Sequence, residues 1–387
     1  MAYRQNKKAY ECPRRDFVVA SAAFAVLPVS ADALDGRAFD AKAAWEAFVK
    51  AYWIPKRAQF RKHQGNDREL LDFWFSAHAW DAIVDASRLF PNSMARSMVP
   101  AFYDAFVKRH PDWRKNEFND DILWWTIACT RAYSATKAVR YLAKARSMFD
   151  WLASREIDDT LGGGMWWKNS ERKSKNACDN FPAVITACNL HRLTRERKYL
   201  ETAKSLYAWG RRTFFDEGTG AVYDHVKTDG ALIRWDFSYN TGTFLGSALR
   251  LHRITGERRY MDDALKAGEH MVTALSPNGV LKPCGQGDGG AFNGIGARYL
   301  AELAVQREGR RFAKWIFDNA GKAWANRRPS DGISGDDWSR APTEDFDVEG
   351  QTANAAVTLM LVAEKLKRRC RGGGRLARNW DNGHLAR

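Results

Sequence analysis

Two adjacent carboxylates, Asp120 and Asp121, open an aromatic-rich stretch whose residue types predict a buried helix. Burying a charged carboxylate is costly unless the charge is paired or used in chemistry. Two carboxylates side by side repel each other, which can raise the pKa of one group while the other stays ionised. One acid and one base or nucleophile are the groups that cleavage of a glycosidic bond requires. The pair is therefore a candidate catalytic centre.

The same residues also fit an ordinary helix start, which is the simpler interpretation of an isolated Asp-Asp pair. Asn119 can cap a helix, and acids are favoured in a first turn by the helix dipole. Trp124 follows Asp121 by about one helical turn, so its flat ring is expected near the same face and could stack on a sugar. Trp125, one position further, is expected in the core.

The elements that must position the pair are helices. After residue 35 the apolar residues recur mostly at i, i+3, i+4 and i+7, which predicts about twelve helical segments. Segments near residues 198, 258 and 310 are amphipathic, whereas those near 120 and 175 are apolar nearly all round and should be buried. This alternation of exposed and buried helices, repeated about six times, predicts a closed ring with the buried helices inside.

The predicted inner helices share polar segments with Asn, Gln or Gly at their starts. These starts should gather at one end of the ring, where helix N-termini also present unpaired N–H groups. That end is the expected pocket. The candidate substrate-binding residues, most of them at or near these starts, are Trp74, Trp124, Trp166, Trp167, Asn176, Asn180, Tyr239, Asn240, Asp288, Phe292 and Gln351.

Two short stretches are not helical in pattern. Glycines 162–164 precede Trp166 and Trp167, but no Gly-Lys-Ser/Thr follows, so a phosphate-binding loop is excluded. These glycines would instead let the backbone and the tryptophans crowd a ligand. Residues 221–226 alternate and predict a short β-ribbon at the mouth of the ring. His225 within it is expected to be a surface or turn histidine rather than a ligand.

Composition narrows the function classes. The chain has 387 residues, 45% of them hydrophobic, and 16 tryptophans, a density that suits carbohydrate contact. The formal net charge is +15, but residues 1–31 and 365–387 hold most of the excess. We interpret it as basic termini rather than a nucleic-acid surface, with attraction to an anionic surface as an alternative. The 6 cysteines form no CxxC pair, so neither a disulfide framework nor a metal site is expected, and no cofactor is implied.

The N-terminus has the three-part pattern of an export signal. Residues 1–15 are basic and end in Arg14-Arg15, and an apolar run over 20–29 precedes small residues. The arginine pair resembles a twin-arginine signal. The run is too short to span a bilayer, and no other stretch is long enough. We therefore expect a signal peptide over 1–33 and a periplasmic or secreted protein; a basic arm before a core strand is the alternative.

Taken together, the motifs resemble glycoside hydrolase family 76, the endo-α-1,6-mannanases. The resemblance covers most of residues 38–367 and is carried by segments 120–125, 162–167, 175–180 and 238–243, with weaker similarity at 289–294 and 351–354. It implies an all-α fold, an (α/α)6 barrel over 36–367. The resemblance also implies a retaining hydrolase of α-mannosidic linkages, with Asp120 as nucleophile and Asp121 as general acid/base. The basic composition of residues 368–387 separately predicts a disordered tail.

The implied partner is an α-mannan-like polysaccharide or oligosaccharide, and the chain is expected to be a monomer that binds no nucleic acid. Two other classes remain open. A sugar epimerase or unsaturated-uronide hydrolase on a similar barrel would use catalytic histidines or a lone acid. Few of the 8 histidines fall at predicted inner-helix starts, which disfavours an epimerase. A non-catalytic glycan-binding or cell-wall protein could use the same aromatic pocket.

Overall fold

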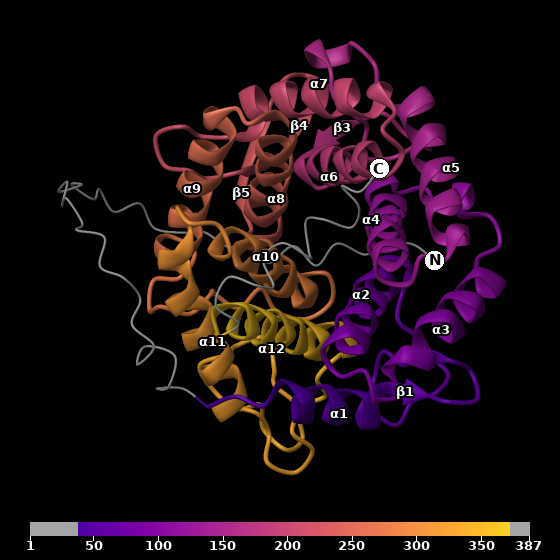
Figure 1. Cartoon of the computed structure of the whole chain (residues 1–387), viewed down its shortest axis with the longest axis vertical. Helices are drawn as coiled ribbons and strands as arrows, with labels where there is room; N and C mark the ends of the chain where they lie inside the picture. Colours follow the sequence, from indigo (N-terminus) through magenta and orange to yellow (C-terminus); the bar gives the residue numbers. More distant parts are fainter. Residues whose placement is uncertain (1–37, 372–387) are drawn as a thin grey trace.

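The computed structural model describes residues 38–371, and in it two concentric rings of helices surround a common axis (Figure 1). The outer ring consists of α1 (Ala41–Tyr52), α3 (Ala95–Arg109), α5 (Val139–Glu156), α7 (Arg197–Phe214), α9 (Arg258–Thr273) and α11 (Ala313–Ala325). The inner ring consists of α2 (Phe73–Leu89), α4 (Asn119–Thr136), α6 (Ala177–Thr194), α8 (Ser238–Thr255), α10 (Gly289–Ala304) and α12 (Gly350–Arg371). The predicted (α/α)6 barrel is confirmed.

The burial of the two rings follows the two sequence patterns. In α6 every residue from Ala177 to Leu190 is buried, as an inner helix requires. In α7 a single stripe is buried while the rest faces solvent. The inner helices α8 and α10 approach closely at Gly242, where an added Cβ would lie 2.8 Å from the Cα atom of Gly296. Side chains larger than hydrogen would push these two helices apart.

Much of the tryptophan content belongs to this core rather than to a sugar site. Trp125 is fully buried as expected: its ring centroid lies 3.8 Å from that of Phe106, and its Nε1 donates to the carbonyl oxygen of Phe73 at 2.8 Å. The largest fully buried side chains include Trp45, Trp80, Trp113, Trp125 and Trp338. The high tryptophan count is therefore a weaker sign of carbohydrate binding than composition alone indicated.

The six inner helices all begin at one end of the barrel, which we call the mouth. It comprises the segments that lead into these helices, with their first residues: 53–72, 110–121, 157–176, 215–238, 274–289 and 326–350. The opposite, closed end comprises the last residues of the inner helices and the turns that follow them: 88–96, 137–140, 192–198, 250–259, 302–311 and 364–371. The closed-end turns are short, whereas the mouth segments are long enough to build a site.

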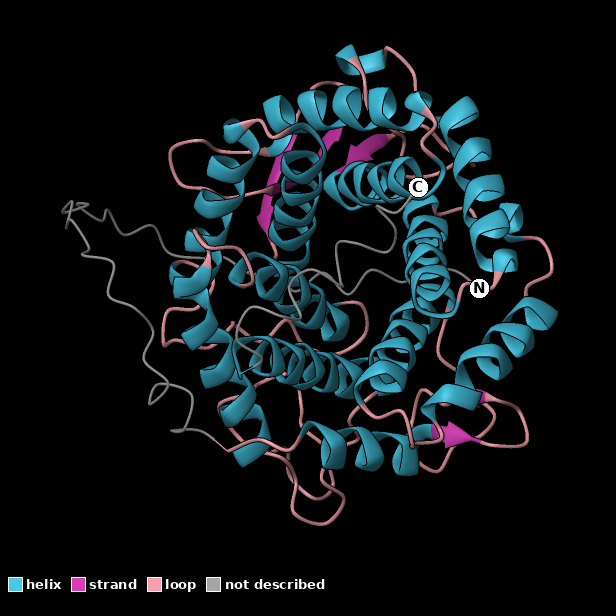
Figure 2. Ribbon diagram, viewed as in Figure 1, coloured by secondary structure: helices cyan, strands magenta, loops and turns pink. Residues whose placement is uncertain are grey.

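All strands of the described residues lie in mouth segments (Figure 2). The hairpin of β1 (Trp53–Ile54) and β2 (Gln59–Phe60) precedes α2. β3 (Ser174–Asn176), β4 (Tyr223–Lys227) and β5 (Leu232–Asp236) form an antiparallel sheet in that order. The predicted β-ribbon over 221–226 is thus confirmed as part of this sheet, with His225 half-buried inside it rather than at its surface.

Two sequence expectations concern the ends of the chain. The predicted signal peptide over 1–33 lies outside the described residues, as does most of the predicted tail. α12 continues past the expected domain boundary at 367 to Arg371, so the first part of segment 368–387 is helical rather than disordered. Arg368 anchors this last turn by donating to the carbonyl oxygen of Leu89 at 2.8 Å. Within residues 38–371, no helix combines the length and apolar character needed to cross a membrane.

Candidate active site

Asp120 and Asp121 lie in the first turn of α4, at the floor of the mouth. The N-cap residue is Phe118, which makes no side-chain cap, so neither aspartate is the N-cap itself. Both side chains keep part of their surface open to solvent, and protein surrounds them on the other sides. Asn116 donates its Nδ2 to Oδ2 of Asp121 at 2.8 Å, whereas Oδ1 of Asp120 is buried without a hydrogen-bond partner.

The surroundings give the two carboxyl groups different proton affinities. Burial raises the pKa of Asp120 to about 7, although hydrogen bonds from the Cys178 thiol and the N–H of Asp121 oppose the rise. The pKa of Asp121 is raised well above its ordinary value by burial and, next, by the charge of Asp120. The nearby carboxylate of Asp288 raises both. Near neutral pH both carboxyl groups therefore hold protons more strongly than an exposed aspartate, and the charge of an ionised Asp120 favours the protonated form of Asp121.

A third carboxyl group, Asp179 in the first turn of α6, adjoins the pair. Its side chain is fully buried, and its oxygen, the Cys178 sulfur and an oxygen of Asp120 all lie within 4.8 Å of one another. Burial and the charge of Asp120 raise the pKa of Asp179 well above its ordinary value, although the backbone N–H groups of Asn176 and Asp120 act to lower it. The Cys178 thiol donates to Oδ2 of Asp179 at 4.0 Å. Asp179 therefore ties the start of α6 to the start of α4.

The spacing of Asp120, Cys178 and Asp179 would admit a metal ion, but their chemistry does not favour one. Carboxyl groups bind metals when ionised, and burial raises the pKa of both aspartates here. Hard cations prefer oxygen ligands without a thiol, and the pKa of the Cys178 thiol is itself raised well above its ordinary value. These three residues therefore do not fit a metal centre.

Asp224 in β4 forms a second polar centre beside the pair. Its Oδ1 accepts from Nδ2 of Asn240 at 2.9 Å and from the hydroxyl of Tyr239 at 3.3 Å. Its Oδ2 lies 2.8 Å from Nδ1 of His225. Asn240 is fully buried, yet its Oδ1 has no hydrogen-bond partner. The sheet and α8 thus bring an organised carboxylate and a free acceptor to the mouth.

Four aromatic residues from four inner helices meet at the mouth. Tyr239 stacks on Phe292, with ring centroids 4.0 Å apart. The Trp74 ring lies 6.5 Å from that of Trp124 and 6.4 Å from that of Phe292. Trp74 and Phe292 are half-buried, so part of each ring faces the opening. Sugar rings bind to such partly open aromatic faces.

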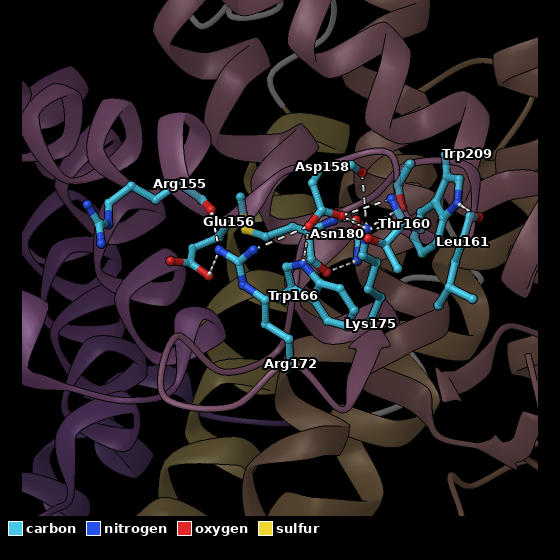
Figure 3. A network of polar contacts seen from close by, with 12 residues as sticks. Arg155, Glu156, Asp158, Thr160, Leu161, Trp166, Arg172, Lys175, Asn180 and Trp209 are labelled. Carbon is cyan, nitrogen blue, oxygen red and sulfur yellow. Dashed lines mark hydrogen bonds and ion pairs between the residues drawn. The ribbon is translucent and has the colours of Figure 1, made fainter. Parts of the chain in front are cut away.

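Trp166 is held in the wall of the barrel rather than presented to the opening (Figure 3). Its side chain is 2% exposed, and its Nε1 donates to Oδ2 of Asp158 at 2.7 Å. The ammonium of Lys175 lies 4.7 Å from the ring centroid of Trp166 and donates to Oδ1 of Asp158 at 2.8 Å. It also donates to the carbonyl oxygens of Thr160 and Gly163 at 2.8 and 2.7 Å. The glycine loop is thereby fastened to β3.

Asn180 and Asn176 belong to the same wall. The Oδ1 of Asn180 accepts from the N–H of Met165 at 2.8 Å, and its Nδ2 donates to the carbonyl oxygens of Met165 and Asn176. These bonds use all of the amide donors and one acceptor position, and the side chain is fully buried. Trp167 is half-buried and packs its ring 5.3 Å from that of Phe118. These contacts hold the wall between the starts of α4 and α6.

The two remaining sequence candidates lie on the α10 and α12 side. Gln351 is buried and donates its Nε2 to the carbonyl oxygen of Gly287 at 3.3 Å, while its Oε1 has no partner. It borders a small cavity together with His78 and Arg298. Burial and the charge of Arg298 lower the pKa of His78 to about 3, so this histidine is neutral. Asp288 is exposed directly before α10.

Sequence reasoning missed Asp179, Asp224 and Asn116. Asp179 carries the same signal as the Asp pair, an acid in the first turn of a predicted inner helix, and could have been found by it. Asp224 alternates within the predicted ribbon, but nothing local showed that the ribbon would face α8. Cys178 was expected to be a small core residue; it is 4% exposed, and its thiol contacts the catalytic candidates.

Comparison with known proteins gives a consistent result. The family model of glycosyl hydrolase family 76 matches residues 38–369. The mannan endo-1,6-alpha-mannosidase DCW1 of Saccharomyces cerevisiae is 28% identical over 218 residues, 51% of this chain and 49% of that protein. The corresponding protein of Candida glabrata is 25% identical over the same shares. The chain thus spans about half the length of the curated relatives it matches.

The solved structures extend the likeness over nearly the whole barrel. The GH76A alpha-1,6-mannanase from Salegentibacter sp. HEL1_6 has a TM-score of 0.79 and 32% identity, covering 84% of this chain and 98% of that one. An inactive variant of that mannanase, with two consecutive aspartates changed to asparagine, is in complex with α-1,6-mannotriose and gives the same scores and coverage. With its family model matched from the first helix to the last, the chain belongs to glycosyl hydrolase family 76.

Proposed function

We propose that the protein is an endo-α-1,6-mannanase that cleaves α-mannosidic linkages with retention of configuration. The observation that carries the proposal is the unequal pair at the floor of the mouth. Burial raises the pKa of both groups, to about 7 for Asp120, and the charge of an ionised Asp120 further favours the protonated form of Asp121. A retaining glycosidase requires one carboxylate as nucleophile and one carboxylic acid as proton donor.

The two side chains would act in two steps. In the first, a carboxylate oxygen of Asp120 bonds to the anomeric carbon, the glycosidic C–O bond breaks, and the leaving sugar takes the proton of Asp121. In the second, ionised Asp121 accepts a proton from water, the water oxygen bonds to the anomeric carbon, and Asp120 is released. The second step thus restores the carboxylate of Asp120 and the proton of Asp121 that the first step used.

The aromatic group at the mouth would hold the sugar over this pair. The open faces of Trp74 and Phe292 suit the apolar faces of sugar rings, and Asp224, held in place by Asn240, would offer its carboxylate to sugar hydroxyls. The mannotriose complex of the Salegentibacter relative supports an α-1,6-mannan substrate class. That the inactive form of that relative lacks two consecutive aspartates supports the role of the pair.

The test measures the products released from linear α-1,6-mannan by the wild type, Asp120→Ala and Asp121→Ala. We expect retention of the anomeric configuration in early products, and a loss of at least about 10²-fold for each variant. Asp159→Ala is the matched control, because that mouth carboxylate is exposed and makes no side-chain cap. Near-wild-type rates for folded Asp120→Ala and Asp121→Ala would refute the proposal.

The alternative of a non-catalytic glycan-binding protein has its own outcome in this experiment. Wild-type protein that binds α-1,6-mannooligosaccharides but releases no product would favour that class, since the aromatic mouth would bind without catalysis.

We further propose, from the twin-arginine-like pattern of the N-terminal sequence, that the protein is exported and acts as a monomer in the periplasm or outside the cell.

A further inference from the structure

The closed end of the barrel carries a concentration of positive charge that the proposed chemistry does not use. Its six segments contain 20 lysines and arginines and 5 acidic residues, a formal net charge of +15. The whole chain also has +15, so everything outside the closed end is neutral in sum. The mouth segments contain 23 acidic and 17 basic residues. The molecule therefore has a positive end and a negative end.

Helix dipoles account for only part of this charge. Cations are favoured in the last turns of the inner helices, as for Arg368 at the end of α12. However, Arg197 begins α7 and Arg258 begins α9, each directly after an acidic N-cap residue, Glu196 or Glu257. The dipole disfavours cations at these positions. Helix stability alone does not explain why basic residues occupy both kinds of helix end here.

Internal pairing does not explain the charge either. The closed end holds pairs such as Arg368 with Glu364 at 2.7 Å and Arg250 with Glu302 at 3.0 Å. Further closed-end cations pair with acids just outside the six segments, such as Arg140 with Asp104 at 2.6 Å and Arg258 with Asp262 at 2.8 Å, but the paired acids remain fewer than the 20 basic residues. Arg96, Arg197 and Arg310 are exposed in three different turns, so the charge faces solvent around the ring rather than in one spot.

Two apolar side chains project from the same end. Met94 is 52% exposed and Val139 is 70% exposed, and basic residues such as Arg96 and Lys137 lie beside them in the chain. Basic residues around projecting apolar side chains are typical of proteins that sit on anionic bilayers. The exposed large aromatics of the described residues, Trp235 and Phe346, lie in mouth segments. The closed end thus lacks the stacking platform of single-stranded nucleic-acid binders.

We propose that the closed end docks onto a bilayer surface rich in anionic phospholipids, with the mouth directed away from the membrane. Attraction of the positive end and repulsion of the negative end would set this orientation. Short turns around one end of the barrel form a broad face that suits contact with a bilayer. Met94 and Val139 would enter the headgroup layer. The proposal is independent of the catalytic assignment.

The test is sedimentation of the full chain with vesicles of phosphatidylglycerol and phosphatidylcholine, against vesicles of phosphatidylcholine alone. We expect binding only to the anionic vesicles. This binding should be lost as the salt concentration is raised from about 0.05 M to about 0.5 M, because screening of the charges grows over this range. Equal binding to both vesicles, or no binding to either at low salt, would overturn the proposal.

Two triple variants with equal change in net charge locate the surface. The closed-end variant is Arg197→Glu, Arg307→Glu and Arg310→Glu, all exposed positions. Its matched control changes three exposed mouth positions, Lys56→Glu, Arg68→Glu and Lys115→Glu. We expect the closed-end variant to lower the vesicle partition coefficient on the order of a hundredfold and the mouth variant to change it by less than about threefold. Circular dichroism and mannanase activity report on folding, and equal losses in both folded variants would refute docking by the closed end.

Two further variants separate the other sources of binding. Met94→Ser with Val139→Ser should weaken binding about tenfold and leave its salt dependence unchanged; no change would refute the role of the apolar side chains. The sequence beyond Arg371 adds 3 arginines and 1 aspartate, so these arginines are changed to glutamate in the full chain. Loss of binding there, without loss in the closed-end variant, would overturn the proposal, as would displacement of vesicles by duplex DNA.

Discussion

The Cys178 thiol, whose sulfur lies within 4.8 Å of an oxygen of Asp120, makes a prediction in which two similar substitutions have opposite signs. The thiol stabilises the ionised form of Asp120 and so lowers its pKa against the effect of burial. Cys178→Ala removes the donor, and Cys178→Ser replaces it with a stronger one. The first change should raise the pKa of Asp120 and the second should lower it, with a small change in side-chain volume in each case.

The magnitude follows from the energy of one hydrogen bond. A typical net contribution is roughly 0.5–1.5 kcal/mol, and one pKa unit corresponds to about 1.4 kcal/mol. The pKa of Asp120 should therefore move by about 0.3–1 unit from its value of about 7. Because Asp120 must be ionised to attack, activity falls as pH falls through this pKa. The acidic limb of the pH profile should shift to higher pH in Cys178→Ala and to lower pH in Cys178→Ser.

The assay is the pH dependence of kcat/KM, which reports the groups of the free enzyme. An α-mannoside with an activated leaving group removes the need for Asp121 as proton donor and leaves the acidic limb to Asp120. Cys188→Ala is the matched control, since Cys188 is a buried cysteine further along α6, beyond the mouth. An unmoved limb, or a shift of the same sign in both Cys178 variants, would refute the reasoning.

Three other outcomes follow from single features. Asp179→Asn should raise the melting temperature at pH 8 and leave it nearly unchanged at pH 4. The pKa of Asp179 is raised in the folded protein, so its carboxyl destabilises the fold as pH rises from about 4 towards that pKa. Equal gains at both pH values in differential scanning fluorimetry would contradict this. Lys175→Met should lower the free energy of unfolding by about 3 kcal/mol in urea titrations, since Asp158 and two carbonyl oxygens lose a buried cationic donor; a change below about 1 kcal/mol would count against the clamp. Replacing Arg14 and Arg15 by lysine should leave unprocessed precursor in the cytoplasm on immunoblots of cell fractions, and unchanged export would exclude a twin-arginine route.

The architecture could be predicted from the sequence because the two rings of the barrel have two different hydrophobic patterns. Helices such as α7 are amphipathic and those such as α6 are apolar nearly all round, so the alternation of rings is visible in the chain. The Asp pair could be predicted for a related reason. A buried helix has few grounds to begin with two acids, and Asp120 and Asp121 open such a helix.

The rest of the site depends on how polar side chains use their hydrogen bonds, which no local pattern records. Asn180 and Asn240 both occupy inner-helix starts. The structure uses the first to hold the backbone of Met165, and it leaves Oδ1 of the second without a partner. The sequence alone does not distinguish the roles of these two asparagines. The closed-end charge is hidden in the same way, because its six segments are far apart in the chain until the barrel closes.

The direction of the inner helices explains why an acidic mouth is tolerated, but not why its acids retain protons. The N-terminal end of α4 favours ionised Asp120 by about 0.3–1 kcal/mol, or up to about 2 in buried geometries. Burial acts in the opposite direction, and a pKa of about 7 instead of 3.8 corresponds to about 4 kcal/mol. Burial therefore wins. It follows that the raised pKa values of the pair depend on the walls that exclude water more than on the helix that carries the two groups.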